Sequence, residues 1–233
     1  MIVETMTYKE ICREFDKINR DYFLRTIHKT DEKKIRQYLR NHRDEKNVYF
    51  KPVICRVDNN SQYITIPHTP DYNTYKKVGL HGRSCLVFSN RHGLNTVMLG
   101  GERDEFYLII TSHFYNRFNE RLFHDESASK MDLIIQCLNC INYFVLSPFP
   151  LENHPNNYIG VTEELIVFAE RVEHNIVLVK TCVTSEQLFS SREGKANSLK
   201  EDLIEYIKYW EQVQQHYLNA SRKRIKLLRL HNI

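Results

Sequence analysis

The stretch 106–123, FYLIITSHFYNRFNERLF, constrains the fold most, because an apolar run leads directly into an amphipathic one. Residues 106–110 are all aromatic or branched aliphatic, which is the composition of a buried strand. Thr111 or Ser112 can then cap a helix, because a side-chain oxygen there can accept from a free first-turn amide. We therefore expect a strand that passes directly into a helix.

Other helices are indicated by apolar side chains that recur every three or four residues. This pattern predicts two N-terminal helices, at 8–27 and from residue 31 to about 41. A strongly apolar helix is expected at 131–144. A stripe of apolar residues predicts one long helix from residue 198 to about 218.

Short apolar runs separated by turn residues predict the strands. They lie at 48–57, 62–67, 84–89, 96–99, 106–110, 158–160, 165–171 and 175–183. Because tight turns join most of these runs, we expect a mainly antiparallel sheet. Residues 68–82 are expected to form a polar surface loop.

These elements indicate an α+β protein, with helices packed on the sheet. We expect an N-terminal helical pair over residues 1–46 that packs on the main domain. The α+β main domain would span 47–190, and 191–233 would form the long C-terminal helix with a basic tail.

Composition restricts the location and the partners. The chain has 233 residues, of which 42% are hydrophobic, and a net charge of +4, which permits an acidic partner without requiring one. No run approaches the roughly 18 apolar residues of a membrane helix. The N-terminus carries acidic residues where a signal peptide needs a basic start. We expect a cytoplasmic protein with no membrane contact and with reduced cysteines.

The helix after residue 111 carries most of the candidate chemistry. At about 100° per residue, its apolar and polar side chains separate onto two faces. The apolar face holds Phe114, Phe118 and Leu122, and the polar face holds His113, Arg117, Glu120 and Arg121. The polar face is either a functional cluster or an ordinary solvated face, in which Arg117 and Glu120 form a surface ion pair of about 0.2–0.5 kcal/mol.

Common catalytic signatures are missing from the sequence. It has no glycine-rich phosphate loop, no His-Glu-x-x-His pair and no Gly-x-Ser-x-Gly elbow, and we expect no cofactor. Cys137 and Cys140 have the spacing of half a zinc site, but they lie in an apolar helical pattern. We expect them to be buried structural residues. A zinc site would require His113, His124 or His154 to converge on them.

The expected loop at 68–82 carries a second candidate site. Tyr72, Tyr75, Lys76 and Lys77 interleave aromatic rings with cations, a combination that can stack bases and hold phosphates. The alternative is an irregular surface segment without a ligand.

The form H-x-x-x-R-x-x-E-R directly after a strand resembles a motif of small bacterial and phage-linked proteins. These belong to the broad barnase, EndoU, colicin and RelE-like nuclease fold. Residues 180–184 also look like the final hairpin of such proteins, where a threonine often lies. The resemblance covers about 106–188, and Lys180 would then contact nucleic acid.

The resemblance implies metal-independent RNA cleavage, in which the 2′-hydroxyl attacks the adjacent phosphate. His113 would act as base or acid, because its ordinary pKa lies near neutrality. Arg117 and Arg121 would bind the non-bridging oxygens, and Glu120 would orient an arginine or act as the base. Thr181 would donate to the phosphate from the neighbouring strand.

We therefore expect an RNA-directed protein, a metal-independent ribonuclease of toxin type. The alternative is a non-enzymatic interaction or regulatory protein, homodimeric through its C-terminal helix. The first hypothesis requires the His113 face to open into a cleft near Thr181.

Overall fold

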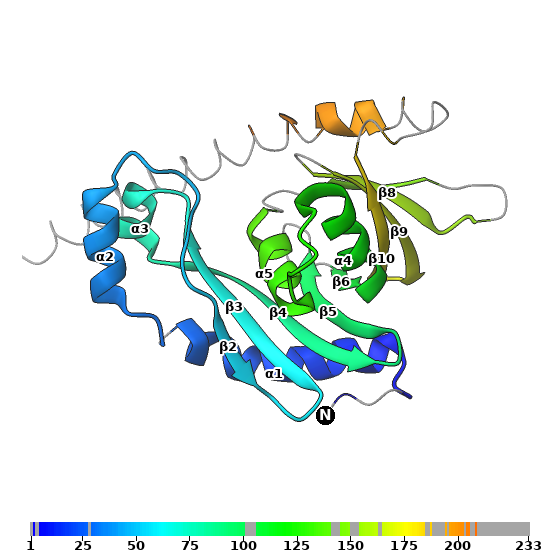
Figure 1. Ribbon diagram of the computed structural model, residues 1–233, viewed down its shortest axis with the longest axis horizontal. Coiled ribbons are helices and arrows are strands. Elements are labelled where there is room, and N and C mark those ends of the chain that lie inside the picture. Colours follow the sequence, from blue (N-terminus) through cyan, green and yellow to red (C-terminus); the bar gives the residue numbers. More distant parts are fainter. Residues whose placement is uncertain are drawn as a thin grey trace, which may run out of the picture.

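The computed structural model describes residues 5–27, 29–100, 106–140, 145–149, 154–162, 165–184 and 196–202, together with 2, 187, 194, 204, 205 and 208 (Figure 1). Within these ranges the chain combines one large sheet with helices on both of its faces, so the predicted α+β class is confirmed. No helix in the described part of the chain is both long and apolar enough to cross a membrane.

Ten strands of the described residues form the sheet. They are β1 (Val48–Tyr49), β2 (Val53–Arg56), β3 (Ser61–Thr69), β4 (His81–Asn90), β5 (Gly93–Gly100), β6 (Phe106–Ile110), β7 (Val145–Pro148), β8 (Asn157–Val161), β9 (Ile166–Glu173) and β10 (Ile176–Val183). Their order is β1-β3-β4-β5-β6-β10-β9-β8-β7, with β2 also paired to β3. The pairing of β6 with β10 is parallel and the others are antiparallel, which confirms the expected mainly antiparallel sheet.

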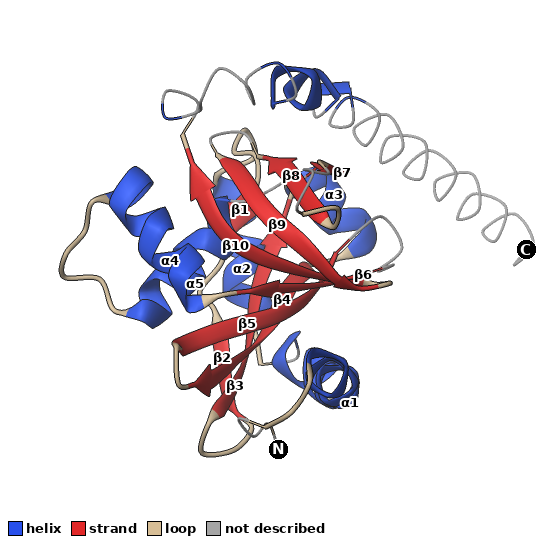
Figure 2. Ribbon diagram, turned by 90° about the vertical axis from the view of Figure 1, so that its right-hand side faces the viewer, coloured by secondary structure: helices blue, strands red, loops and turns tan. Residues whose placement is uncertain are grey.

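One face of the sheet is covered by α4 (Ser112–Phe118), the π-helical turn η1 (Asn119–Phe123) and α5 (Lys130–Cys140) (Figure 2). Phe114 and Phe118 are buried there, as the helical spacing predicts. They pack with α5 residues and with strand side chains that point to this face of the sheet, such as Val179. This cluster is the largest part of the core and fixes α4 against β10.

The opposite face is covered by α1 (Tyr8–Ile27), which has the predicted bounds. Phe15 and Ile18 of this helix pack on strand side chains that point to the α1 face, among them Ile109 and Leu178. Because successive strand residues point to opposite faces, β6 and β10 contribute to both layers of the core.

The two N-terminal helices pack in different clusters. Ile35 and Leu39 of α2 (Glu32–Asn41) are buried with Val48 and Tyr75, away from the α1 cluster. Tyr75 belongs to α3 (Tyr72–Val78), so the prediction of a loop over 68–82 is wrong. This helix is too short to show a helical period, and its signals are the Asp71 cap on the Thr74 amide and Gly79 at φ 80°.

Smaller differences have local causes. The predicted strand 48–57 is two strands, separated at Pro52, which cannot donate to a ladder. Strand β7 was not expected. The prediction of a long C-terminal helix lies mostly outside the described residues; among those described, Ala196 and Leu199 are buried against β8 and β9.

Candidate functional site around His113

The junction between β6 and α4 is held by Thr111. Its Oγ1 accepts from the Phe114 amide at 3.3 Å, so Thr111, rather than the alternative Ser112, caps the helix. Its hydroxyl donates to the carbonyl oxygen of Lys180 at 3.3 Å, and its amide donates to the carbonyl of Val179 at 3.1 Å. Thr111 therefore fixes the start of α4, and His113 with it, relative to β10.

The turn between β4 and β5 is held against the same junction. The side-chain oxygen of Asn95 accepts from the Ser112 amide at 3.0 Å, and its nitrogen donates to the Gly93 carbonyl at 2.9 Å. Asn95 is only 4% exposed. Gly93 has φ 110°, and a Cβ there would lie 2.6 Å from the Ser112 hydroxyl. The hairpin tip is thus fixed beside the first turn of α4.

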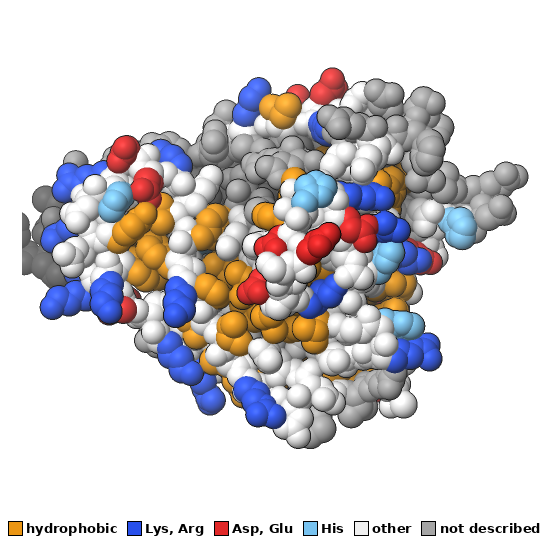
Figure 3. All heavy atoms as spheres, in the orientation of Figure 1, with side chains coloured by type: hydrophobic (Ala, Val, Ile, Leu, Met, Phe, Trp, Pro, Cys, Tyr) orange, Lys and Arg blue, Asp and Glu red, His pale blue; other side chains and the backbone are white. Residues whose placement is uncertain are grey.

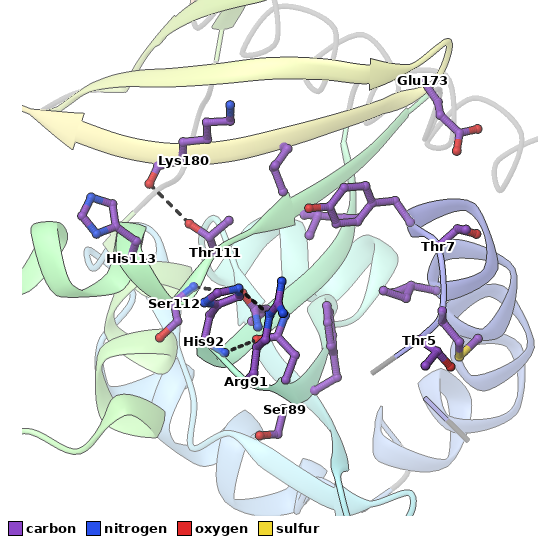
Figure 4. Close-up of a pocket in the computed structure, with 18 of the residues that line it drawn as sticks. Thr5, Thr7, Ser89, Arg91, His92, Thr111, Ser112, His113, Glu173 and Lys180 are labelled. Carbon is purple, nitrogen blue, oxygen red and sulfur yellow. Dashed lines mark hydrogen bonds between the residues drawn. The ribbon is translucent and has the colours of Figure 1, made fainter. Parts of the chain in front are cut away.

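A cavity of about 1290 Å³ opens between this hairpin tip, the β6–α4 junction, β10 and the N-terminal end of α1. Apolar side chains such as Ile109 and Leu178 line its base, and His113, Arg91, His92 and Lys180 bring polar groups to it (Figure 4). Glu173 is the one carboxylate among the described residues that line it. Two imidazoles and two cations from three separate parts of the sequence, residues 91–92, 113 and 180, thus line one cavity.

His92 is held in one orientation. The Asn90 side chain accepts from its amide at 2.9 Å, and the Arg91 Nε–H donates to His92 Nε2 at 3.0 Å. That nitrogen is therefore an acceptor, and the neutral ring carries its proton on Nδ1. Sequence reasoning missed Arg91 and His92, because a hairpin turn has no periodicity; two basic residues at its tip were the signal.

Ser112 and Asn116 of α4 also line the cavity, but the charged residues of α4 and η1 do not. Arg117 forms an ion pair of 2.6 Å with Glu120, and their side chains are 40% and 54% exposed. Arg121 donates to the carbonyl oxygen of Cys182 in β10.

Burial raises the pKa of the Cys182 thiol to about 12, despite the neighbouring Arg121 and Arg117. The thiol is therefore protonated at neutral pH.

Thr181 does not line the cavity onto which His113 opens. It pairs with Phe168 of β9, on the face that packs against Ala196 and Leu199. The next residue, Cys182, points to the opposite face, into the core under α4. A register shift between Val179 and Thr181 reverses the alternation of side chains, and it turns Thr181 away from α4.

Three of the predicted nucleic-acid residues do come together. Tyr72, Tyr75 and Lys76 line a groove of about 360 Å³ between α2 and α3, with Arg36 and Arg40 contributed by α2. The other two lie elsewhere: Lys77 does not line this groove, and Lys180 lies at the cavity near His113, where its ammonium group pairs with Glu170.

The cysteine pair has no convergent histidine in the described structure. Cys137 is buried in the core cluster, whereas His113 is exposed on α4. Among the described residues, no group of three or more His, Cys, Asp or Glu side chains is placed to hold a metal ion. Cys137 is a core residue; the side chain of Cys140 lies outside the described residues.

Comparison of the chain with known protein families, with curated proteins and with solved structures finds no match. The resemblance of the His113 helix to nuclease-type proteins therefore stays a hypothesis, and the function is argued from the geometry alone.

Proposed function

We propose that the protein is an RNA-directed ribonuclease that needs no metal ion, and that it acts at the cavity around His113. The observation that carries this proposal is the opening of His113 onto the cavity that also contains His92, Arg91 and Lys180. Two imidazoles and fixed positive charge are the groups that phosphodiester cleavage by the adjacent 2′-hydroxyl requires.

In the proposed reaction the 2′-oxygen bonds to the phosphorus and the bond from phosphorus to the 5′-oxygen breaks. On substrate binding Arg91 would turn from His92 to the phosphate, which frees Nε2 of that ring. One imidazole then takes the proton of the 2′-hydroxyl, and the other, as the protonated imidazolium, gives a proton to the departing 5′-oxygen. Arg91 and Lys180 offset the charge on the non-bridging oxygens. The products are a 2′,3′-cyclic phosphate and a 5′-hydroxyl, so the protons and electrons balance without a further reactant.

The proposal keeps part of the predicted site and changes the rest. His113 remains an acid or base, and Arg117 lies one helical turn further on, where it can contact a neighbouring phosphate. Thr181 does not line the cavity and Arg121 binds a backbone carbonyl, so neither is assigned a catalytic role.

The alternative is a non-enzymatic interaction protein. The ion pair between Arg117 and Glu120 favours it, because both charges are satisfied within the chain, as on an ordinary solvated face. In that case the His113 face would bind a partner without reacting with it.

The two functions are separated by incubating the full chain with single-stranded RNA in the presence of EDTA. We expect cleavage to 2′,3′-cyclic phosphate ends, and a loss of about 10²- to 10⁴-fold in His113→Ala. The matched control is His154→Ala, which removes an exposed imidazole from outside the cavity. Absence of cleavage by the unaltered protein, or equal rates in the two variants, would overturn the proposal.

A further inference from the structure

We propose that the groove between α2 and α3 is a second RNA site, which holds a backbone phosphate through Arg36, Arg40 and Lys76. The inference rests on the proposed function for the identity of the partner, single-stranded RNA. It assigns this groove a role separate from the cavity, namely binding the strand without reading its bases.

The two arginines are held on one face of α2. Arg36 and Arg40 are four residues apart, so they lie one above the other beside the groove. Ile35 and Leu39 are buried beneath them, which fixes the helix against β1 and α3. Two guanidiniums in this arrangement can bind one phosphate in a bidentate manner, which an ammonium group does poorly.

The tyrosines orient cations and are not platforms for bases. Tyr75 is only 9% exposed and belongs to the core, and its hydroxyl, which lies beside Arg36, raises the pKa of that guanidinium. The Tyr72 ring lies 5.2 Å from the Arg43 guanidinium and 5.5 Å from the Lys76 ammonium. Because cations already occupy the accessible ring, phosphate binding is favoured over base stacking.

Charge and size agree with a phosphate ligand. Glu32 is the one carboxylate among the described residues that line the groove, against the two arginines and Lys76. Figure 3 shows Lys and Arg side chains gathered over the end of the molecule that holds α2 and α3. A volume of about 360 Å³ suits one nucleotide unit.

The groove and the cavity are at different ends of the sheet. In Figure 1, α2 and α3 lie at one end, and α4 with β10 at the other. A long strand can contact both sites, but a dinucleotide in the cavity cannot reach the groove. The groove should therefore affect the binding of long RNA and leave the reaction of a dinucleotide unchanged.

The test compares two double variants of the full chain that lose equal charge. Arg36→Ala with Arg40→Ala removes the groove cations, and Lys17→Ala with Lys34→Ala removes two exposed lysines that do not line it. Binding to a long single-stranded RNA is measured by fluorescence anisotropy at several salt concentrations, with thermal unfolding as the check on folding. Cleavage of a dinucleotide is measured in parallel.

We expect the groove variant alone to lose about tenfold in affinity, with the slope of log affinity against log salt reduced by about one. Equal losses in both variants would show general electrostatics and overturn the proposal. Groove-dependent binding to anionic lipid vesicles, without groove-dependent binding to RNA, would overturn it as well. Since anisotropy needs no cleavage, an inactive protein whose RNA binding depends on the groove would refute the ribonuclease proposal and leave this one standing.

Discussion

The hydroxyl of Thr111 donates to the carbonyl oxygen of Lys180 at 3.3 Å. The Thr111 hydroxyl oxygen also accepts from the Phe114 amide and so caps the first turn of α4. One threonine thus joins the start of the helix to the strand beside it, where β6 and β10 pair in parallel. His113 follows two residues later. The position of the candidate acid or base therefore depends on this side chain.

We predict that Thr111→Val lowers the free energy of unfolding by about 1 kcal/mol, because the cap and the tie to β10 are both lost. Thr111→Ser keeps the hydroxyl and should restore most of the loss. Urea denaturation of the three proteins measures the effect. Equal stability of the valine and serine variants would contradict the assigned role.

Gly93→Ala should be more destabilising than Gly79→Ala. Both glycines have positive φ, but a Cβ at Gly93 meets the Ser112 hydroxyl at 2.6 Å, whereas nothing lies within 4 Å of a Cβ at Gly79. Backbone strain alone is about 1 kcal/mol, and the contact adds to it at Gly93 only. Denaturation midpoints of the two variants give the comparison, and a smaller loss at Gly93 would show that the hairpin tip moves freely.

The stability of the fold should decrease as the pH falls from about 6.5 to about 4. Burial lowers the pKa of His68 to about 4, and the charges of Arg83 and His81 beside it act in the same direction. Between the unfolded and folded values the unfolded state binds the extra proton, so acid favours unfolding. Over this pH range the free energy of unfolding should decrease by an amount on the order of 1–3 kcal/mol.

His68→Gln removes that titration, so its stability should depend less on pH over the same range. Chemical denaturation at several pH values measures both proteins, and His174→Gln, at the exposed turn between β9 and β10, is the control. If the free energy of unfolding depends on pH equally in wild type and in His68→Gln, His68 is not the source of the loss of stability in acid.

Thr181→Val should leave RNA cleavage within a few-fold of wild type, because Thr181 does not line the cavity. Arg121→Ala should act mainly on stability, because its guanidinium binds the Cys182 carbonyl. Initial rates are to be compared with melting temperatures for each variant. A folded Thr181→Val protein without activity would restore threonine to the site.

The sequence predicted the elements whose pattern is local and long enough to repeat. The period of α1, the strand at 106–110 and the Thr111 cap all follow from neighbouring residues, and the structure contains each of them. The seven-residue helix α3 was missed because it covers fewer than two full turns.

The candidate site was harder to predict, because it depends on register and on distant contacts. Strict alternation along β10 would place Thr181 on the same face as Val179, but the register shift between them puts Cys182 there. Likewise, Arg91 and His92 line the same cavity as His113, where Asn95 holds the hairpin tip to the Ser112 amide, a contact between separate turns. Neither feature leaves a periodic signal in the sequence.

Phosphorus NMR of a ribodinucleotide incubated with the protein and EDTA tests directly whether the cavity around His113 cleaves RNA. We expect wild type to form the 2′,3′-cyclic phosphate. His113→Ala and His92→Ala should each slow this step by at least about 10²-fold, while their melting temperatures stay near that of wild type. Formation of no cyclic phosphate by wild type, or a wild-type rate in a folded His92→Ala protein, would contradict the proposed reaction.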